Sequence, residues 1–444
     1  MCGIAGFCNF KEDFEENTDY WNFRLEKMRA VLAHRGNDAR GRYLKKHIGL
    51  SHSRLAIRDI LCGDQPMTRT HNGYEYTICY NGEIYNTDEL IPELSENGFV
   101  CSTTSDTEVI LYAYIHWGAD FVNRLNGIFA FAIWDAAKSR LLLYRDRVGV
   151  KPLFYAIRGD SLVFGSEPKA CFAHPAVKPE LDKQGLQELL AIGPAHTSGL
   201  SLFKDLFEVL PGHFMIYSRD GLHDETYWEL TSREHTESYR DTVAHTRFLV
   251  EDAIKRQMVS DVPVCTFLSG GIDSSIVTAI AANYMNTRGK TLNTFSFDFK
   301  DNDRYFKANA FQPERDLPYV NRMLEEYETA HSYLECDENS LFKALFAAVD
   351  AKDMPGMTDV DSSLLYFCSL VSRKNKVALT GECADEIFGG YPWFYRKELL
   401  ERYGFPWSSD VAPRLALLRD DVGLELDLSG YQAFRYEESR SKAP

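Results

Sequence analysis

A short apolar run that passes directly into a glycine-rich segment constrains the fold of this chain more than any other feature. Residues 264–268 (VCTFL) predict a buried strand, and residues 269–275 read SGGIDSS. A helix-like apolar pattern follows over 274–285. A strand, a glycine turn and a helix in this order predict one unit of a parallel sheet, with the turn at the carboxyl end of its strand.

The alternation of strands and helices continues through the C-terminal half. The expected strands are 264–268, 292–297, 332–335 and 377–380, and the expected helices are 242–258, 274–285, 317–327, 340–351 and 362–373. Continuous apolar strands separated by helices predict an α/β domain with a parallel sheet, in which ligands bind at the carboxyl ends of the strands.

The N-terminal half has many short strands that are rich in aromatic and β-branched residues. The expected strands are 2–8, 48–57, 74–85, 129–134, 140–145, 153–157 and 161–164, and the expected helices are 21–33 and 106–117. This pattern predicts an α+β domain with antiparallel sheets layered with helices. A helix near 183–192 and a turn-rich stretch over 210–237 indicate the join.

The glycine-rich segment has the chemistry of a phosphate site. Its glycines let backbone N–H groups approach phosphate, its hydroxyls add donors, and a helix N-terminus adds positive potential. Asp273 would repel phosphate unless a cation lay between them, which indicates Mg²⁺. The lysine of a Walker A loop is missing. An SGGxDS sequence arises by chance roughly once per million positions, so an ordinary helix start is the weaker alternative.

A second acidic segment follows the expected strand 377–380. Glu382, Asp385 and Glu386 place three acids within five residues at the end of that strand. Like charges so close together favour a metal or a cationic partner. The alternative is an acidic turn in contact with solvent.

Cys2 is the candidate nucleophile of the N-terminal half. If Met1 is removed, Cys2 carries a thiol and a free α-amine, whose ordinary pKa of about 7.7–8.0 suits a general base. The alternative is a small buried residue in the first strand.

Three further signals in this half are weak individually. Asn81-Gly82 is a hairpin turn or two donors of an oxyanion hole, and Arg54 is an edge residue or a fork for a carboxylate. Asp106 is an ordinary helix start or an acceptor for an ammonium group.

From residue 1 to about 170, the chain resembles the class II glutamine amidotransferase domain. The segments that carry the resemblance are MCGIAGF at 1–7, HRG at 34–36, HSRLAI at 52–57, YNGEIYN at 80–86 and RDRVGVKPL at 145–153. The resemblance implies that Cys2 attacks glutamine and that Asn81 and the Gly82 N–H form the oxyanion hole. It further implies a set of glutamine-binding residues: Arg54, Leu55, Ala56, Ile57 and Arg58 on the carboxylate side, and Glu83 and Asp106 at the amine. Asn37 departs from the proline that is common in the family.

The C-terminal half resembles the ATP-pyrophosphatase synthetase domain of asparagine synthetases, and the order of the two halves is that of the glutamine-dependent enzymes. The resemblance implies that ATP activates aspartate as β-aspartyl-AMP, with release of pyrophosphate, and that ammonia displaces AMP. The implied pyrophosphate-binding residues are Ser269, Gly270, Gly271, Asp273, Ser274 and Ser275. Phe267, Phe297, Thr380 and Gly381 would line the adenylate. Asp273 and Asp385 would bind Mg²⁺, and Glu382 would assist the reaction.

The resemblance also sets the expected domain boundaries. These are a glutamine amidotransferase domain over 1–212, a connecting segment over 213–237, and a synthetase domain over 238–444 whose C-terminal part is missing. Cys383 stands where glycine is usual. Because ammonium is not nucleophilic, we expect a sheltered passage for ammonia between the domains. We also expect glutamine hydrolysis to survive in this chain, and asparagine formation to be weak or absent.

Composition excludes several classes of partner. The chain has 49 Lys and Arg against 65 Asp and Glu, and a formal net charge of −16 disfavours nucleic acid and anionic membranes. No apolar run is long enough to span a bilayer and no export signal is evident, so we expect a cytoplasmic protein with reduced cysteines. The expected partners are glutamine, aspartate and ATP, and a homodimer is possible.

Three other functions remain open at this stage. A related ligase with a different carboxylate acceptor would keep both halves. Another class of glutamine amidotransferase would need an isomerase or phosphoribosyltransferase domain, which the SGGIDSS loop disfavours. A degraded relative would serve only as a binding or regulatory subunit.

Overall fold

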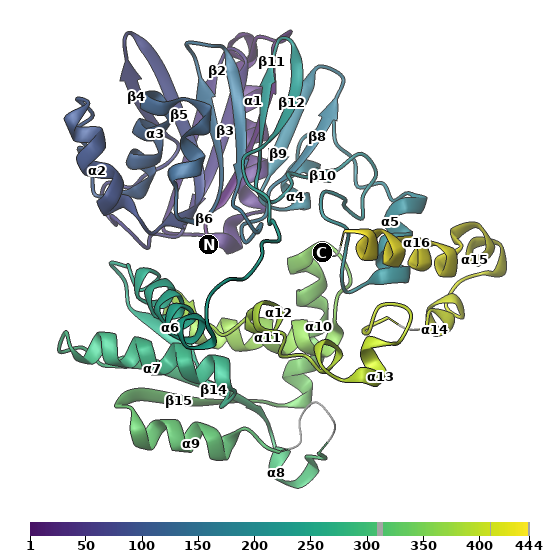
Figure 1. Cartoon of the computed structure of the whole chain (residues 1–444). Helices are drawn as coiled ribbons and strands as arrows, with labels where there is room; N and C mark the ends of the chain where they lie inside the picture. The colour runs from purple at the N-terminus through teal and green to yellow at the C-terminus, as the bar shows by residue number, and fades with distance from the viewer. Residues whose placement is uncertain (309–313, 409, 443–444) are drawn as a thin grey trace. The chain divides into compact units, whose positions relative to one another are not determined.

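The computed structural model describes residues 1–308, 314–408 and 410–442. The chain divides into two compact units, Met1–Ser232 and Arg233–Pro444 (Figure 1). Each unit has its own sheets and its own hydrophobic core. No helix among the described residues combines the length and apolarity needed to cross a membrane.

The first unit contains two antiparallel six-stranded sheets. The first sheet has the order β10-β8-β9-β1-β3-β2, and its strands are β1 (Gly3–Asn9), β2 (Ala39–Lys45), β3 (Ile48–Arg54), β8 (Phe154–Arg158), β9 (Ser161–Gly165) and β10 (Phe207–Glu208). The second sheet has the order β12-β11-β7-β6-β5-β4, and its strands are β4 (Met67–His71), β5 (Tyr74–Ile84), β6 (Gly127–Asp135), β7 (Arg140–Arg145), β11 (His213–Ser218) and β12 (Gly221–Thr226).

The two sheets form the inner layers of a four-layer sandwich. Ile4 of β1 and Cys79 of β5 meet in a core between the sheets. The outer face of the first sheet packs against α1 (Thr18–Ala30) and α4 (Pro168–Phe172). Because side chains alternate along a strand, each strand in the middle of a sheet contributes to two cores. The expected α+β architecture is confirmed.

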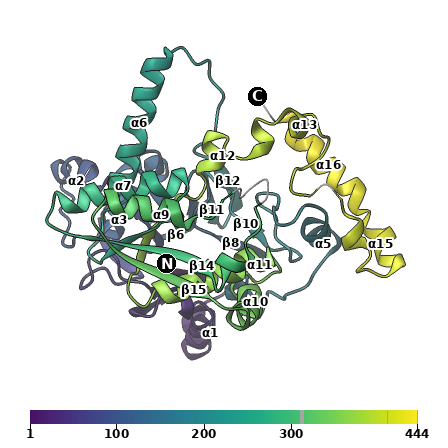
Figure 2. The same ribbon diagram turned by 90° about the horizontal axis from the view of Figure 1, so that it is seen from below.

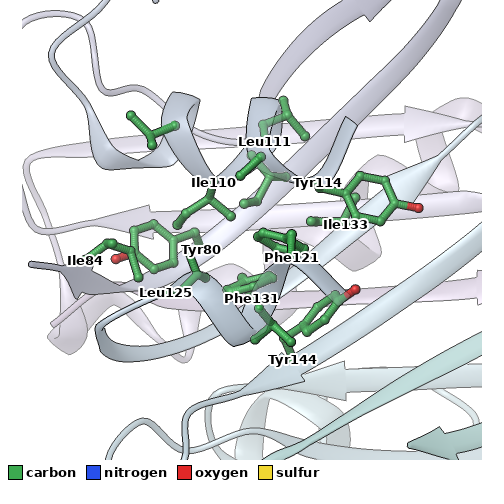
Figure 3. Packing of buried hydrophobic residues seen from close by; sticks show 14 of the residues in the cluster. Tyr80, Ile84, Ile110, Leu111, Tyr114, Phe121, Leu125, Phe131, Ile133 and Tyr144 are labelled. Carbon is green, nitrogen blue, oxygen red and sulfur yellow. The ribbon is translucent and has the colours of Figure 1, made fainter. Parts of the chain in front are cut away.

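The outer face of the second sheet packs against α2 (Thr87–Glu96) and α3 (Asp106–Trp117). Figure 3 shows the aromatic part of this core, where Tyr80, Phe131 and Tyr144 from the sheet face Ile110 and Tyr114 from α3. Helix α3 begins where the sequence predicts, because the Ser105 side chain accepts a hydrogen bond from the Thr107 N–H.

Residues 213–226 differ from their expected role in the connecting segment, because they form strands β11 and β12 of the second sheet. Phe214 packs in the core beside α3, whereas Met215 and Tyr217 pack between the sheets. This alternation is the signature of a strand buried on both faces. The sequence did not predict this hairpin, because β12 and the turn before it are rich in polar residues and lack the apolar alternation of a strand.

Strands β2 and β4 were also missed. Each is the last strand of its sheet and carries charged or polar side chains, as edge strands commonly do. Helix α5 (Lys183–Gln187) lies near the expected helix 183–192 and continues as a single wide helical turn over Glu188–Ile192.

The second unit contains one parallel sheet of four strands in the order β15-β14-β13-β16. The strands are β13 (Val264–Phe267), β14 (Leu292–Phe299), β15 (Thr329–Cys336) and β16 (Val377–Leu379), and all three pairings are parallel. The expected α/β fold is confirmed. The main helices are α6 (Tyr239–Arg256), α7 (Ile272–Asn286), α9 (Leu317–Glu326), α10 (Glu338–Lys352) and α11 (Thr358–Val371).

Helices cover both faces of this sheet. Ala281 and Ala282 of α7 pack beside Val264 and Leu292, whereas Phe367 of α11 packs beside Phe295. Figure 2 shows α7 and α9 on one side of β14 and β15. The chain runs from β13 outward through β14 to β15 and then returns to β16 on the other side of β13. Adjacent strands whose connections leave in opposite directions open a crevice at their carboxyl ends, the usual ligand position in such sheets.

Candidate active sites

Cys2 precedes β1 and continues the alternation of that strand. Ile4 and Cys8 point into the core between the sheets, so Cys2 faces the same side. The Leu55 N–H donates to Cys2 Sγ at 3.4 Å, and the Leu55 carbonyl accepts from the thiol at 3.6 Å. Burial raises the pKa of this thiol, while the Leu55 hydrogen bond and the positive N-terminus act in the opposite direction.

The N-terminal amine lies in surroundings that suit a base. Burial lowers the pKa of the Met1 α-amine to about 6, and the nearby cations Arg35 and Lys151 act in the same direction. Removal of Met1 would transfer the free amine to Cys2, one residue along the chain. An amine that is uncharged at neutral pH can accept the proton of a thiol.

The segment His34-Arg35-Gly36 holds Cys2 in place. Arg35 Nε donates to the Cys2 carbonyl at 2.9 Å. A Cβ at Gly36 would lie 2.4 Å from the Arg54 carbonyl carbon and 2.5 Å from the Leu55 nitrogen, so only glycine permits this close approach.

Asn81 and Gly82 lie inside β5 and are paired with Ala130 and Phe129 of β6, so the hairpin alternative is wrong. Asn81 is buried, and its side-chain Nδ2 has no hydrogen-bond partner among the described residues. A buried amide without a partner is costly unless a ligand completes it. Asn81 shares the parity of Cys79, so its side chain points into the space between the sheets that Cys2 also faces.

The N–H of Gly82 lies on the edge of β5 that β6 leaves free. The N–H groups of Tyr80 and Ile84 both donate away from β6, to Gln65 Oε1 at 2.6 Å and to Asp106 Oδ2 at 3.1 Å. Because N–H directions repeat every second residue in an antiparallel pair, the Gly82 N–H points to the same edge.

Glu83, which is half-buried, and Asp106, which is buried, form a pair of interacting carboxyl groups. Asp106 accepts hydrogen bonds from the Tyr80 hydroxyl at 2.9 Å and from the Ile84 N–H, and Arg58 Nη1 lies 4.0 Å away. Burial and the neighbouring Asp106 raise the pKa of Glu83 to about 8, and burial also raises the pKa of Asp106. Arg58, Lys151 and the N-terminal amine oppose this rise for Glu83 without cancelling it, so the pair still favours the binding of one more positive group, such as an α-ammonium.

The Arg54 guanidinium is engaged by the protein itself and is not held ready for a substrate carboxylate. Its terminal nitrogens donate to the backbone carbonyls of Asp59 at 2.5 Å and Ile60 at 3.0 Å, and to Asp64 Oδ1 at 3.1 Å. Arg54 therefore holds the loop that follows β3. This loop carries Leu55, Ala56 and Ile57, and Ala56 is fixed by Asp38 through its N–H at 2.8 Å.

The glycine-rich segment of the second unit forms a tight loop between β13 and α7. Gly270 has φ +86°, and a Cβ there would lie 2.8 Å from Tyr319 Cβ. The Ser269 and Ser274 hydroxyls lie 3.0 Å apart, and Ser274 Oγ also donates to the Gly271 carbonyl. The loop thus places the Ser269 and Ser274 hydroxyls at the N-terminus of the 15-residue helix α7, where the helix dipole favours an anion.

A cavity of about 360 Å³ opens at the carboxyl ends of β13 and β16. Of the predicted nucleotide and catalytic residues, it is lined by Phe267, Ser269, Gly271, Asp273, Ser274, Phe297, Thr380, Gly381, Glu382 and Asp385. The structure therefore brings two segments together that are more than 100 residues apart. Gly270 and Ser275 are not among the lining residues.

Asp273 and Asp385 lie close enough to interact. Burial raises the pKa of Asp273, and the charge of Asp385 raises it further. A Cβ at Gly381 would lie 2.8 Å from Asp273 Cβ, so glycine is needed where the two loops meet. Mg²⁺ typically takes one or two carboxylates and completes its shell with phosphate oxygens and water, and this pair fits that requirement.

Five lining residues received no site role from sequence reasoning: Leu268, Phe295, Phe367, Cys383 and Tyr391. Glu386, which also lines the cavity, was named only as part of the acidic segment. Phe367 is the most informative of these. Its ring centroid lies 4.6 Å from that of Phe267 and 5.1 Å from that of Phe297, which makes an aromatic wall at the cavity. Nothing in the local sequence of α11 distinguishes Phe367 from an ordinary core residue. Glu386 and Tyr391 flank predicted positions and had a signal in the acidic segment.

Comparisons with known proteins find a match for each half of the chain. Residues 1–228 match the family described as the glutamine amidotransferase domain, and residues 245–444 match the family described as asparagine synthase. The chain is 46% identical over 445 residues to glutamine-hydrolysing asparagine synthetase 3 of Bacillus subtilis (strain 168), covering 100% of the chain and 72% of the relative.

Two further relatives are more distant. The chain is 32% identical over 401 residues to glutamine-hydrolysing asparagine synthetase 1 of the same organism, covering 90% of the chain and 60% of the relative. It is also 32% identical over 431 residues to amidase chyE of Penicillium rubens, covering 93% of the chain and 62% of the relative. The chain thus spans roughly two thirds of the length of these relatives. By its two matched regions and its identity over the full chain, this protein belongs to the family of glutamine-hydrolysing asparagine synthetases.

Proposed function

We propose that the protein takes nitrogen from glutamine at Cys2 and uses ATP to transfer it to the side chain of aspartate, forming asparagine. One observation carries this proposal. The Cys2 thiol faces the side of the sheet to which the buried Asn81 amide points, and Asn81 Nδ2 has no partner within the described part of the chain. The same chain has a separate cavity with a glycine loop and a carboxylate pair.

Glutamine hydrolysis begins once Met1 is removed. The α-amine of Cys2 accepts the thiol proton, and the thiolate attacks the side-chain amide carbon of glutamine. Asn81 Nδ2 and the Gly82 N–H stabilise the oxyanion that forms. The ammonium of Cys2 then protonates the leaving nitrogen, ammonia departs, and water hydrolyses the thioester to release glutamate.

We expect the two ends of glutamine, its α-ammonium and its α-carboxylate, to bind to different parts of this unit. Glu83 and Asp106 bind the α-ammonium of glutamine, as the raised pKa values of this carboxyl pair favour an added cation. The loop 55–58, which Arg54 holds in place, lines the carboxylate side. For Arg54 to bind the glutamine carboxylate directly, its N–H groups would have to bond the carboxylate as well as the backbone carbonyls of Asp59 and Ile60.

In the second unit, the glycine loop and the N-terminus of α7 bind the phosphates of ATP, and the aromatic wall with Thr380 and Gly381 binds the adenosine. The aspartate side-chain carboxylate attacks the α-phosphorus, and pyrophosphate leaves. Ammonia then attacks the acyl carbon, AMP leaves, and a proton is released. Asp273 and Asp385 would hold Mg²⁺, which neutralises charge on the phosphates when bound. Glu382 lies at the cavity, where it can accept that proton.

A different carboxylate acceptor is the second candidate, because amidase chyE is similar along nearly the whole chain. The decisive experiment supplies glutamine, ATP and Mg²⁺ with aspartate or with a panel of other carboxylic acids. Glutamate, pyrophosphate and the amide product are measured. Pyrophosphate and amide that appear only with aspartate support asparagine formation, whereas release with another acid favours the alternative.

Two variants separate the two half-reactions. Cys2→Ala is expected to abolish glutamine hydrolysis and to leave any synthesis from added ammonium salt unchanged. Asp273→Asn is expected to leave glutamine hydrolysis intact and to abolish pyrophosphate release. Loss of both half-reactions in either folded variant contradicts the proposed division. The expectation that this chain forms asparagine only weakly or not at all is tested by the same assay, which measures the amount of amide product. The cytoplasmic location, the homodimer, the ammonia passage and the lack of nucleic-acid binding stay predictions.

A further inference from the structure

Lys151 is a buried lysine that sequence analysis did not place among the site residues. It lies in the loop that follows β7, and its side chain is only 8% exposed. Its backbone is held on both sides, because its N–H donates to Asp146 Oδ2 at 2.9 Å and its carbonyl accepts from Arg145 Nε at 3.1 Å. The loop therefore fixes the backbone from which the Lys151 side chain extends.

The ammonium of Lys151 is directed at the N-terminus. Lys151 Nζ lies 3.2 Å from Met1 Sδ, and Arg35 Nη2 lies 3.9 Å from the same sulfur. A thioether is a weak acceptor and offers little compensation for burying two cations. Removal of Met1 would take this sulfur away, and the new α-amine would form at Cys2. Arg35 and Lys151 already act on the N-terminus, and Lys151 also acts on Cys2, so that amine would form within reach of their charges.

We infer that Lys151 is a positioning residue for glutamine hydrolysis, whose positive charge keeps the Cys2 α-amine uncharged and favours the Cys2 thiolate at neutral pH. This inference rests on the proposed role of Cys2 as the nucleophile. Lys151 does not need to contact glutamine, since it acts through the electric potential at the N-terminus.

The charges around this position come from several elements. The groups that interact with the N-terminus, with Cys2 or with Lys151 are Arg35, which follows α1, Arg54 of β3, Cys79 and Glu83 of β5, and Asp146 of the same loop. The two arginines act in the same direction as Lys151. Glu83 opposes Lys151 at the N-terminus and at Cys2. Burial lowers the pKa of Lys151, and Glu83 and Asp146 act against burial by favouring its charged form.

The test measures how alkylation of Cys2 by iodoacetamide depends on pH, in the purified chain with its N-terminal mass determined. Modification is followed at the N-terminal peptide by mass spectrometry, because other cysteines are exposed. Lys151→Met removes the charge and keeps the stem. We expect it to move the alkylation midpoint upward by about one pH unit. Lys151→Arg should restore the midpoint.

Lys138→Met is the matched control, because Lys138 is exposed in the turn between β6 and β7. It should leave the midpoint unchanged. The pH profile of kcat/KM for glutamine hydrolysis is recorded in parallel, and its acidic limb should move with the alkylation midpoint. Thermal unfolding checks each variant, and Lys151→Gln replaces Lys151→Met if the latter does not fold.

The outcomes separate this inference from the proposed function. An unchanged midpoint in the folded, uncharged variant overturns the role of Lys151 even if glutamine is hydrolysed. A shifted midpoint in a chain that does not hydrolyse glutamine supports the electrostatic role and contradicts the proposed function. A shift that Lys151→Arg does not restore assigns the effect to packing and also overturns the inference.

Discussion

Arg35 links Glu167 to the backbone of Cys2. Arg35 Nη1 donates to Glu167 Oε1 at 2.7 Å, and Arg35 Nε donates to the Cys2 carbonyl at 2.9 Å. His34 Nε2 also lies 3.0 Å from Glu167 Oε1. The carboxylate therefore holds the segment that fixes the N-terminus, although it lies far from Cys2 in the sequence.

The first prediction concerns Glu167→Gln. Burial alone would raise the pKa of Glu167, but the His34 hydrogen bond and the charge of Arg35 outweigh burial and lower it to about 2. Because its unfolded value is about 4.5, this group stabilises the fold above that pH, and the stabilisation is lost as pH falls from 4.5 to 2. The contribution is about 3 kcal/mol. We expect Glu167→Gln to lower the free energy of unfolding by about this amount at pH 7.

Denaturant unfolding at several pH values checks this prediction. The difference between the wild type and Glu167→Gln should narrow as pH falls below 4.5. Glu93→Gln is the control, since Glu93 forms an exposed pair with Arg124, and such pairs contribute under about 1 kcal/mol. Equal losses in the two variants would contradict the buried role of Glu167.

Asn81→Ala is expected to lower kcat for glutamine hydrolysis by about 10²–10³ with little change in KM, because it removes an oxyanion donor that acts mainly in the transition state. Steady-state assays of glutamate release measure both constants. Asn97→Ala, at the exposed end of α2, serves as the control. A large rise in KM with unchanged kcat would instead assign Asn81 to substrate binding.

Binding of glutamine should strengthen as pH rises from 7 toward 8. The pKa of Glu83 is raised to about 8 by burial and by Asp106, so Glu83 must lose its proton before it can pair with the substrate ammonium. Glu83→Gln should raise the KM for glutamine about tenfold and remove this pH dependence. The pH profile of KM measures both effects. A KM that stays pH-dependent in Glu83→Gln excludes this carboxyl group as the cause.

Cys383→Gly should stabilise the second unit. Cys383 has φ +70°, a left-handed conformation that costs an L-residue roughly 1–2 kcal/mol and glycine very little. We expect a gain of about 1 kcal/mol in the free energy of unfolding, measured by denaturant titration. Cys383→Ala removes the thiol but keeps Cβ, so it should give no gain. Equal stability of the two variants would show that backbone strain is not released here.

Local sequence was sufficient to predict the main strands, turns and helices that carry the residues of the two sites. The SGGIDSS segment predicted the turn between β13 and α7, and Ser105 predicted the start of α3 at Asp106. These features depend on residues that are neighbours in the chain, such as an N-cap side chain and the N–H group it binds. The parallel and antiparallel character of the sheets likewise follows from the length and polarity of each run.

The choice between two roles for one residue depended on the tertiary structure. Asn81-Gly82 suited a hairpin equally well, and only the pairing of β5 with β6 placed it inside a strand. The sequence suggested that Arg54 binds a substrate carboxylate, whereas in the structure its N–H groups donate to backbone carbonyls of the loop 58–60. Both outcomes require partners that local propensity does not encode.

The sequence by itself therefore determined which segments are strands, turns and helices at the two sites, and the kinds of functional group that they bring. The tertiary structure decided which of those groups lie close together, as Phe367 illustrates at the cavity and Lys151 beside the side chain of Met1. The physical reason is that a side chain's burial, charge environment and hydrogen-bond partners come mostly from strands and loops distant along the chain, and their register is settled only when the cores pack.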